Sequence, residues 1–167
     1  MSATSEVEPD ADTESVARKI LLDQLTGRAR TRHELAAKLA GKNVPSDVAT
    51  RLLDRFVDVG LIDDLAFARM WVSSRQPARG LTRRVLAQEL RRKGVADDVA
   101  GLALDEIDPD AEEASARELV RKRMRSLARV DQATATRRLI GQLARKGHAP
   151  GLAARIVREE LAANAPD

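Results

Sequence analysis

Asp63 and Asp64 are the neighbouring carboxylates of this sequence that come nearest to a catalytic pair. General acid–base catalysis would require both side chains to reach one substrate atom. Consecutive residues of a helix point about 100° apart, so these two side chains do not converge. An aspartate at the start of a helix instead accepts hydrogen bonds from free backbone N–H groups. The pair therefore predicts a helix start rather than an active site.

The other residues that commonly carry catalysis or bind cofactors are isolated. Neither His33 nor His148 has a second histidine or a carboxylate at metal-ligand spacing such as HExxH. The chain contains no GxxxxGK[ST], GxGxxG or GxSxG motif and no cysteine, which excludes a disulfide framework and thiolate metal sites. We therefore expect no enzymatic activity, no metal and no cofactor.

Arginine supplies the remaining functional signal, because its planar guanidinium suits bidentate contact with phosphate or carboxylate. Aromatic residues make up 2% of the chain, so contacts with a nucleic-acid backbone are more plausible than stacking on bases. The alternative for any one cluster is a solvated face of Glu–Arg pairs, and the sequence leaves it open. The candidate contact residues are Arg28, Arg30, Arg32, Arg75, Arg79, Arg83, Arg84, Arg91, Arg92, Lys93, Arg137, Arg138, Arg145 and Lys146.

The net charge of +3 conceals an uneven distribution of charge. Residues 1–14 contain five carboxylates and no lysine or arginine, which leaves 29 basic against 21 acidic side chains in the rest of the chain. An acidic tail on a basic body indicates a polyanionic partner or one with an acidic surface. We interpret residues 1–14 as disordered. No apolar run approaches the ~18 residues of a membrane span and no signal peptide is evident, so we expect a cytoplasmic protein.

Helix signals recur along the whole chain, and the residue composition favours helix over strand. Ser15 starts the first helix and Gly27 ends it; Thr31 with Glu34 forms a capping box, and Ser46 or Asp47 caps the third helix. The third helix carries Val57 inward, and the sixth carries Leu102 inward. Later helices are expected at 64–74, from Thr82 to Gly94, and at 97–107, 109–127, 133–146 and 150–161.

The helix after Asp64 contains the only tryptophan, Trp71, and one of two phenylalanines, Phe67. These residues lie one helical turn apart, on one face. Two of the largest apolar groups placed together predict the centre of the core. With Asp63 and Asp64 they form a structural core signature.

The predicted helices fall into three copies of one unit. Leu35, Leu86 and Leu139 lie 51 and 53 residues apart. Thr31-Arg32 matches Thr82-Arg83, and Lys93-Gly94 matches Lys146-Gly147. The period is near fifty residues, and helix starts and ends recur at the same places in each unit. This pattern predicts an all-α fold of three tandem three-helix, helix-turn-helix-like repeats. We place them at 15–60, 61–108 and 109–163, followed by a frayed end at 164–167, and expect neighbouring repeats to share buried surface.

Three ordered motifs resemble those of the RecX family of RecA regulators. GLIDDLAFARMWVSSR (60–75) is similar to its core of a glycine, a hydrophobic residue, two aspartates and an aromatic residue before alanine. LLDQLTGRARTRHELAAKL (21–39) resembles its first-repeat motif, and LTRRVLAQELRRKGV (81–95) its downstream motif. The match covers about 16–161. Trp71 often differs in other members, the third repeat matches loosely, and the acidic tail is not a family feature.

This resemblance implies an elongated, curved molecule that binds the RecA filament on DNA. It implies a modulator, mainly an inhibitor, of ATP hydrolysis, strand exchange and co-protease activity in homologous recombination, DNA repair and the SOS response. The expected partners are RecA and, through weak backbone-type contacts, DNA; we expect a monomer. The rival interpretation is a stand-alone helix-turn-helix-like DNA-binding protein, for which the helix carrying Arg83, Arg84 and Gln88 is the best candidate reader.

Overall fold

The structure of the chain, a computed structural model, describes the backbone of residues 9–164 and the side chains in that range apart from residues 9, 10, 77 and 78. Over this range it consists of helices, turns and loops, with no strand. The helices are α1 (Pro9–Leu25), α2 (Arg32–Ala40), α3 (Ser46–Asp58), α4 (Asp64–Arg79), α5 (Arg83–Arg92), α6 (Asp97–Asp105), α7 (Pro109–Met124), the 3-10 turn η1 (Arg125–Leu127), α8 (Gln132–Arg145) and α9 (Pro150–Ala163).

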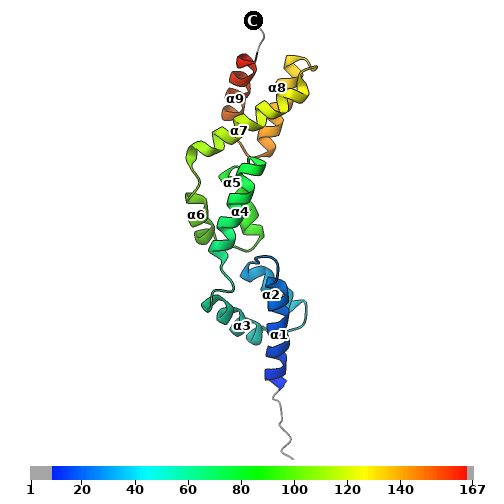
Figure 1. Cartoon of the computed structure of the whole chain (residues 1–167), viewed down its shortest axis with the longest axis vertical. Coiled ribbons are helices and arrows are strands. Elements are labelled where there is room, and N and C mark those ends of the chain that lie inside the picture. Colours follow the sequence, from blue (N-terminus) through cyan, green and yellow to red (C-terminus); the bar gives the residue numbers. More distant parts are fainter. Residues whose placement is uncertain (1–8, 165–167) are drawn as a thin grey trace, which may run out of the picture.

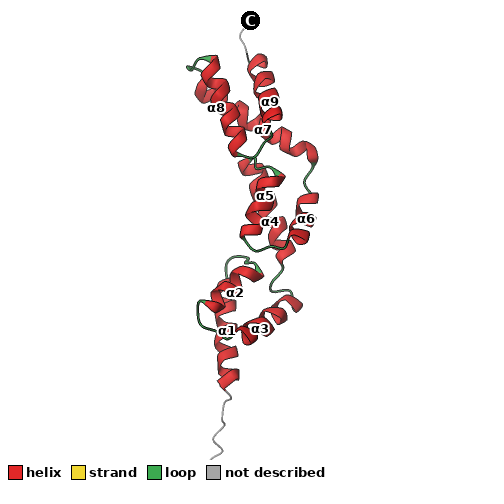
Figure 2. Cartoon of the chain, turned by 180° about the vertical axis from the view of Figure 1, so that it is seen from behind, coloured by secondary structure: helices red, strands yellow, loops and turns green. Residues whose placement is uncertain are grey.

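The helices group in threes along an elongated, bowed molecule (Figure 1). The first repeat, α1–α3, lies at one end, and the third, α7–α9, lies at the other. The second repeat, α4–α6, joins them, as the view from behind also shows (Figure 2). The predicted all-α fold of three tandem three-helix repeats is confirmed.

Each repeat buries its own hydrophobic core. The first core is built from residues of α1–α3 and the loop after α3, the second from α4–α6 and its loops, and the third from α7–α9 with η1. The leucines that recur in the sequence form the centres of these cores, since Leu35, Leu86 and Leu139 are 0–1% exposed. Phe67, 4% exposed, lies in the second core rather than in one shared by the whole molecule.

The junctions between repeats are polar and involve backbone groups. The Thr31 hydroxyl, at the start of α2, donates to the carbonyl oxygen of Lys93 at 2.6 Å. At the second junction the Thr82 backbone N–H donates to the carbonyl oxygen of Lys146 at 3.2 Å. Both threonines are buried, as is His148, whose Nε2 lies 3.1 Å from the Gly80 carbonyl oxygen. Neighbouring repeats thus share buried surface, and buried polar groups form hydrogen bonds across both junctions.

Two helices extend beyond their predicted limits. The helix α1 begins at Pro9, so residues 9–14 of the supposed tail are helical, whereas residues 1–8 lie outside the described part of the chain. Proline fits a first helical turn, and Glu14 pairs with Arg18 at 2.9 Å. The helix α4 continues past position 77, although a proline there has no backbone N–H to donate, and ends at the left-handed Gly80, whose φ is 59°.

Three local predictions on α3 and α6 were wrong. Neither Ser46 nor Asp47 caps α3, whose N-cap is Pro45 without a side-chain hydrogen bond. Val57 is 42% exposed and Leu102 is 56% exposed, although both were expected to point inward. The buried face of α6 is formed by alanines and Leu104, so its apolar stripe is rotated away from Leu102.

Candidate interaction surface

The two aspartates of the 60–75 motif cap two different helices. Asp63 is the N-cap of α4, and its side chain accepts a hydrogen bond from the Ala66 backbone N–H at 2.8 Å. Asp64 accepts the backbone N–H of Arg32 at 2.9 Å and thereby caps α2 of the preceding repeat. Glu112 repeats this arrangement by accepting the backbone N–H of Arg83. The acidic pair therefore orients α4 against the first repeat.

Trp71 is the centre of a charged group, the Trp71 cluster, that spans the first junction. Its ring stacks on Phe67 with centroids 5.6 Å apart, and its Nε1–H donates to a Glu89 carboxylate oxygen at 2.9 Å. The guanidinium of Arg75 lies 3.7 Å from the centre of the ring. Lys93 lies 5.2 Å from the same ring and pairs with Glu34 of the first repeat at 2.8 Å. The cluster comprises Glu34, Trp71, Arg75, Glu89 and Lys93.

The pKa of Glu34 is lowered by its hydrogen bonds in this arrangement. Partial burial acts to raise its pKa, but the hydrogen bonds from Lys93 and from the Thr31 backbone N–H outweigh burial and lower the pKa below its ordinary value. Both oxygens of Glu34 are thus occupied, one by the capping box of α2 and one by Lys93. Lys93, a candidate contact residue, is accordingly neutralised within the protein.

Three further candidate arginines are held by carboxylates of their own repeat. Arg32 pairs with Asp54 at 2.5 Å, and Arg91 pairs with Asp97 at 3.1 Å. Arg83 pairs with Asp105 and also donates to the Leu104 carbonyl oxygen at 3.0 Å. The ion pairs of Arg32 and Arg83 occupy equivalent positions. In both repeats an ion pair therefore joins the second helix to the third.

The remaining candidates of the first two repeats differ in how free they are. Arg30 is half-buried and donates to the Gln24 side chain at 3.2 Å, whereas its Nε is buried without a partner. Four others are exposed and have no ion pair within the described part of the chain. These free candidates are Arg28, Arg79, Arg84 and Arg92.

The four candidates of the third repeat lie together. Arg137, Arg138, Arg145 and Lys146 line one hollow of about 760 Å³ on α8. Arg123 of α7 completes its basic lining, and the other lining residues are Thr134, Gly141 and Gln142. No carboxylate lines this hollow, and none of the five cations has an ion pair among the described residues. We call these five residues the α8 basic hollow.

Arg123 is not among the candidate contacts predicted from the sequence. The signal that could have found it is its spacing from Arg75, 48 residues, which equals the spacing of Asp64 and Glu112. Two other arginines of α7 lie instead in an ion network with α9. Arg117 pairs with Glu159 at 2.6 Å, and Arg121 pairs with Glu160 at 2.7 Å.

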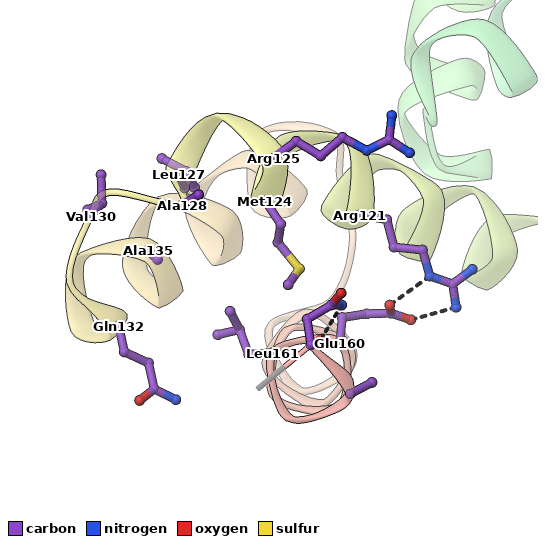
Figure 3. Close-up of a pocket in the computed structure, with 12 residues that line it drawn as sticks. Arg121, Met124, Arg125, Leu127, Ala128, Val130, Gln132, Ala135, Glu160 and Leu161 are labelled. Carbon is purple, nitrogen blue, oxygen red and sulfur yellow. Dashed lines mark hydrogen bonds and ion pairs between the residues drawn. The ribbon is translucent and has the colours of Figure 1, made fainter. Parts of the chain in front are cut away.

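A second hollow, of about 770 Å³, lies where α7, η1 and the start of α8 face α9 (Figure 3). Met124 points into it, and Arg121 and Glu160 are joined by hydrogen bonds at its edge (Figure 3). Besides apolar residues and the Arg121–Glu160 ion pair, its lining includes Arg125, Gln132 and Asn164, and it offers no acid–base or nucleophilic pair. The described residues also hold no group of three histidines or carboxylates placed to bind a metal, and no helix among them is long and apolar enough to cross a membrane.

Three such repeats in this order are also found in a known protein family. A family model described as the first three-helix domain of RecX matches residues 17–56, and the models of its second and third three-helix domains match 63–104 and 110–157. The chain belongs to the RecX family. All three RecX domains are therefore present, in their expected order.

Curated RecX relatives are similar over most of their length. The protein named regulatory protein RecX in Streptomyces coelicolor is 46% identical over 154 residues, which cover 92% of this chain and 82% of that relative. The regulatory protein RecX of Mycobacterium avium is 49% identical over 152 residues, covering 90% and 87%. The chain is thus a member of a family of regulatory proteins.

Solved RecX structures share the fold. The crystal structure of RecX from Lactobacillus salivarius superposes with a TM-score of 0.79 and covers 91% of this chain and 99% of that one at 22% identity. A second crystal structure, of a regulatory protein RecX, gives a TM-score of 0.76 at 23% identity and covers 90% of this chain and 73% of that one. These two solved structures therefore share the fold of this chain.

Proposed function

We propose that this chain modulates, and mainly inhibits, a RecA recombinase by binding its filament on DNA. Binding would restrain ATP hydrolysis, strand exchange and co-protease activity in DNA repair and the SOS response. The observation that carries the proposal is the complete ordered set of RecX domains. The elongated scaffold supports it further, because exposed cations on successive repeats can reach more than one subunit of a polymer.

The mechanism we favour is steric and electrostatic. A filament on DNA offers acidic protein surface and nucleic-acid phosphate, and free guanidinium groups can bind either. The free candidates Arg79, Arg84 and Arg92 and the α8 basic hollow supply such groups on the second and third repeats. A monomer bridging neighbouring subunits in the cytoplasm would block filament growth or favour disassembly without turning over a substrate.

The rival function, in which α5 alone reads bases in a DNA groove, has less support. Base readout uses the N-terminal residues of a recognition helix. Here Arg83 is held by Asp105 and the Leu104 carbonyl oxygen, and Thr82 is buried against the turn that contains Lys146. The N-cap of α5 is therefore covered by the next repeat and Arg83 is engaged within its own repeat, which leaves Arg84 as the free arginine of the first turn.

The decisive test is single-stranded-DNA-dependent ATP hydrolysis by purified RecA, titrated with this protein at low and high salt. We expect hydrolysis to fall at substoichiometric protein. The double variant Arg84→Gln/Arg92→Gln should need more protein for the same inhibition, because both side chains are exposed and free. Arg129→Gln/Arg158→Gln removes the same charge from exposed third-repeat positions outside the candidate surface and is the matched control. Unchanged hydrolysis with the wild-type protein would overturn the proposal.

A further inference from the structure

The α8 basic hollow occupies the position in the third repeat that the Trp71 cluster occupies in the second. Arg123 and Leu119 follow Arg75 and Trp71 by 48 residues, and Gln142 and Lys146 follow Glu89 and Lys93 by 53. Both repeats therefore carry a cation at each of the two basic positions. Leucine stands in the third repeat where the second has tryptophan, and glutamine stands where the second has glutamate.

The loss of counter-charges extends to the neighbouring repeat. Lys93 is neutralised by Glu34, which lies on α2 of the preceding repeat. The corresponding residue for Lys146 is Val85, which follows Glu34 by 51 residues. Both carboxylates that neutralise the Trp71 cluster are therefore missing from the α8 basic hollow. Five cations that share one hollow repel one another, which raises the free energy of the folded protein. A bound anion would reduce this repulsion.

The shape and lining of the hollow indicate the class of anion. A protein partner usually places an apolar or aromatic anchor at the centre of its interface. The lining here consists of cations, Thr134, Gly141 and Gln142, with no hydrophobic residue. Gly141 occupies the position of Gln88 in the second repeat, and a guanidinium nitrogen of Arg145 lies 3.5 Å from where a Cβ on Gly141 would be. A positively charged groove without a hydrophobic anchor residue suits a phosphate backbone better than a protein surface.

The spacing of the cations fits a chain of phosphates. Arg138 and Arg145 lie two turns apart on one face of α8, roughly 10 Å along the helix axis at ~1.5 Å per residue. A strand of B-form DNA carries one phosphate per about 3.4 Å of helix axis, so two cations about 10 Å apart along α8 can contact different phosphates of one strand. Arg123 adds a third cation from the neighbouring helix α7.

We propose that the α8 basic hollow binds the phosphodiester backbone of a nucleic acid, without reading its sequence. The inference deepens the proposed function and rests on it for its biological setting, since a filament regulator that grips DNA through its third repeat leaves the first two repeats free for the protein. The binding itself is a property of this chain, and RecA is not required for it.

The test is the binding of a short fluorescein-labelled oligothymidylate to the full chain, followed by fluorescence anisotropy over a range of salt concentrations with RecA left out. We expect salt-sensitive binding by the wild-type protein. Arg138→Gln/Arg145→Gln should weaken it about tenfold or more at low salt and lower the slope of log Kd against log salt by about 1.4, the value for two lost single-strand phosphate contacts. Both side chains are exposed and unpaired, so the fold should be kept, which circular dichroism checks.

The control Arg129→Gln/Arg158→Gln removes two charges from the same repeat outside the hollow and should leave the slope nearly unchanged. Equal losses in both double variants, or no salt-sensitive binding by the wild-type protein, would overturn the proposal. Normal oligonucleotide binding by Arg138→Gln/Arg145→Gln with weaker inhibition of RecA would assign the hollow to a protein surface instead. Because RecA is added only in the hydrolysis assay, a failure of the DNA site and a failure of the proposed function give different results.

Discussion

Gly94 lies directly against His33 of the preceding repeat, and a Cβ on Gly94 would come within 2.2 Å of the His33 Cβ. Gly147 has the same relationship with Thr82, whose hydroxyl oxygen would lie 2.4 Å from a Cβ. Both glycines also have positive φ, 78° and 95°. Each turn is thus pressed against the repeat before it so closely that there is no room for a side chain.

The first repeat has the same turn without this constraint. Asn43 precedes Gly94 by 51 residues, follows a lysine as Gly94 does, and has a φ of 58°. Asparagine tolerates the left-handed region better than most residues with a side chain. No repeat precedes the first one within the described part of the chain, so its turn needs the backbone conformation but not the missing Cβ. A glycine is therefore needed at this position only where the turn packs against a preceding repeat, as at Gly94 and Gly147, and asparagine suffices in the first repeat.

The substitution Gly94→Ala should destabilise the protein by more than backbone strain alone. Positive φ costs an alanine about 1–2 kcal/mol, and the collision with His33 should add about 1–3 kcal/mol, because the Cβ of His33 cannot move without its helix. Gly60→Ala is the matched control, since Gly60 has a φ of 77° and open space around its Cβ position. Urea unfolding of both variants measures the difference, and equal costs would contradict the tight junction.

Thr31→Ala should cost more than Thr82→Ala. The Thr31 side chain accepts the Glu34 N–H at 3.1 Å and donates to the Lys93 carbonyl oxygen at 2.6 Å. Thr82 accepts the Val85 N–H at 3.4 Å, and its junction hydrogen bond comes from its backbone, which alanine keeps. We expect a loss of about 2 kcal/mol at position 31 and about 1 kcal/mol at position 82. The reverse order in urea unfolding would show that the Thr31–Lys93 bond contributes little.

The repeated fold could be predicted from the sequence, but which charged side chains form ion pairs could not. Leu35, Leu86 and Leu139 could be aligned because burial at a fixed period leaves a pattern in one sequence. Whether Lys93 is free depends on Glu34, which lies 59 residues away and approaches only when two repeats stack. Arginine clusters look alike in a sequence whether a carboxylate from another helix reaches them or not. For this reason paired and free candidates could be separated only in the structure.

Replacing Trp71 tests how much the Trp71 cluster contributes to stability. Trp71→Phe keeps an aromatic ring against Phe67 and Arg75 but removes the hydrogen bond to Glu89, which should cost about 1–2 kcal/mol. Trp71→Leu, the residue found at position 119, also removes the cation–π contact and should cost about 0.5–2 kcal/mol more. Circular dichroism during urea unfolding measures both, because each variant lacks the only tryptophan. Equal stabilities for the two variants would mean that the ring's contact with Arg75 is unimportant.

Acidification should weaken the third repeat through its ion network. Hydrogen bonds from Arg121 and then Arg117 hold the pKa of the buried Glu160 below its ordinary value of 4.5, despite the opposing effect of burial. Because the pKa is lower in the folded than in the unfolded protein, this stabilisation is complete well above 4.5 and is lost as the pH falls through the folded pKa. Glu160→Gln cannot titrate, so its Tm should be lower than that of the wild type at neutral pH and should fall less on acidification. Parallel losses of Tm in both proteins, measured by circular dichroism, would show that Glu160 does not contribute to the acid sensitivity.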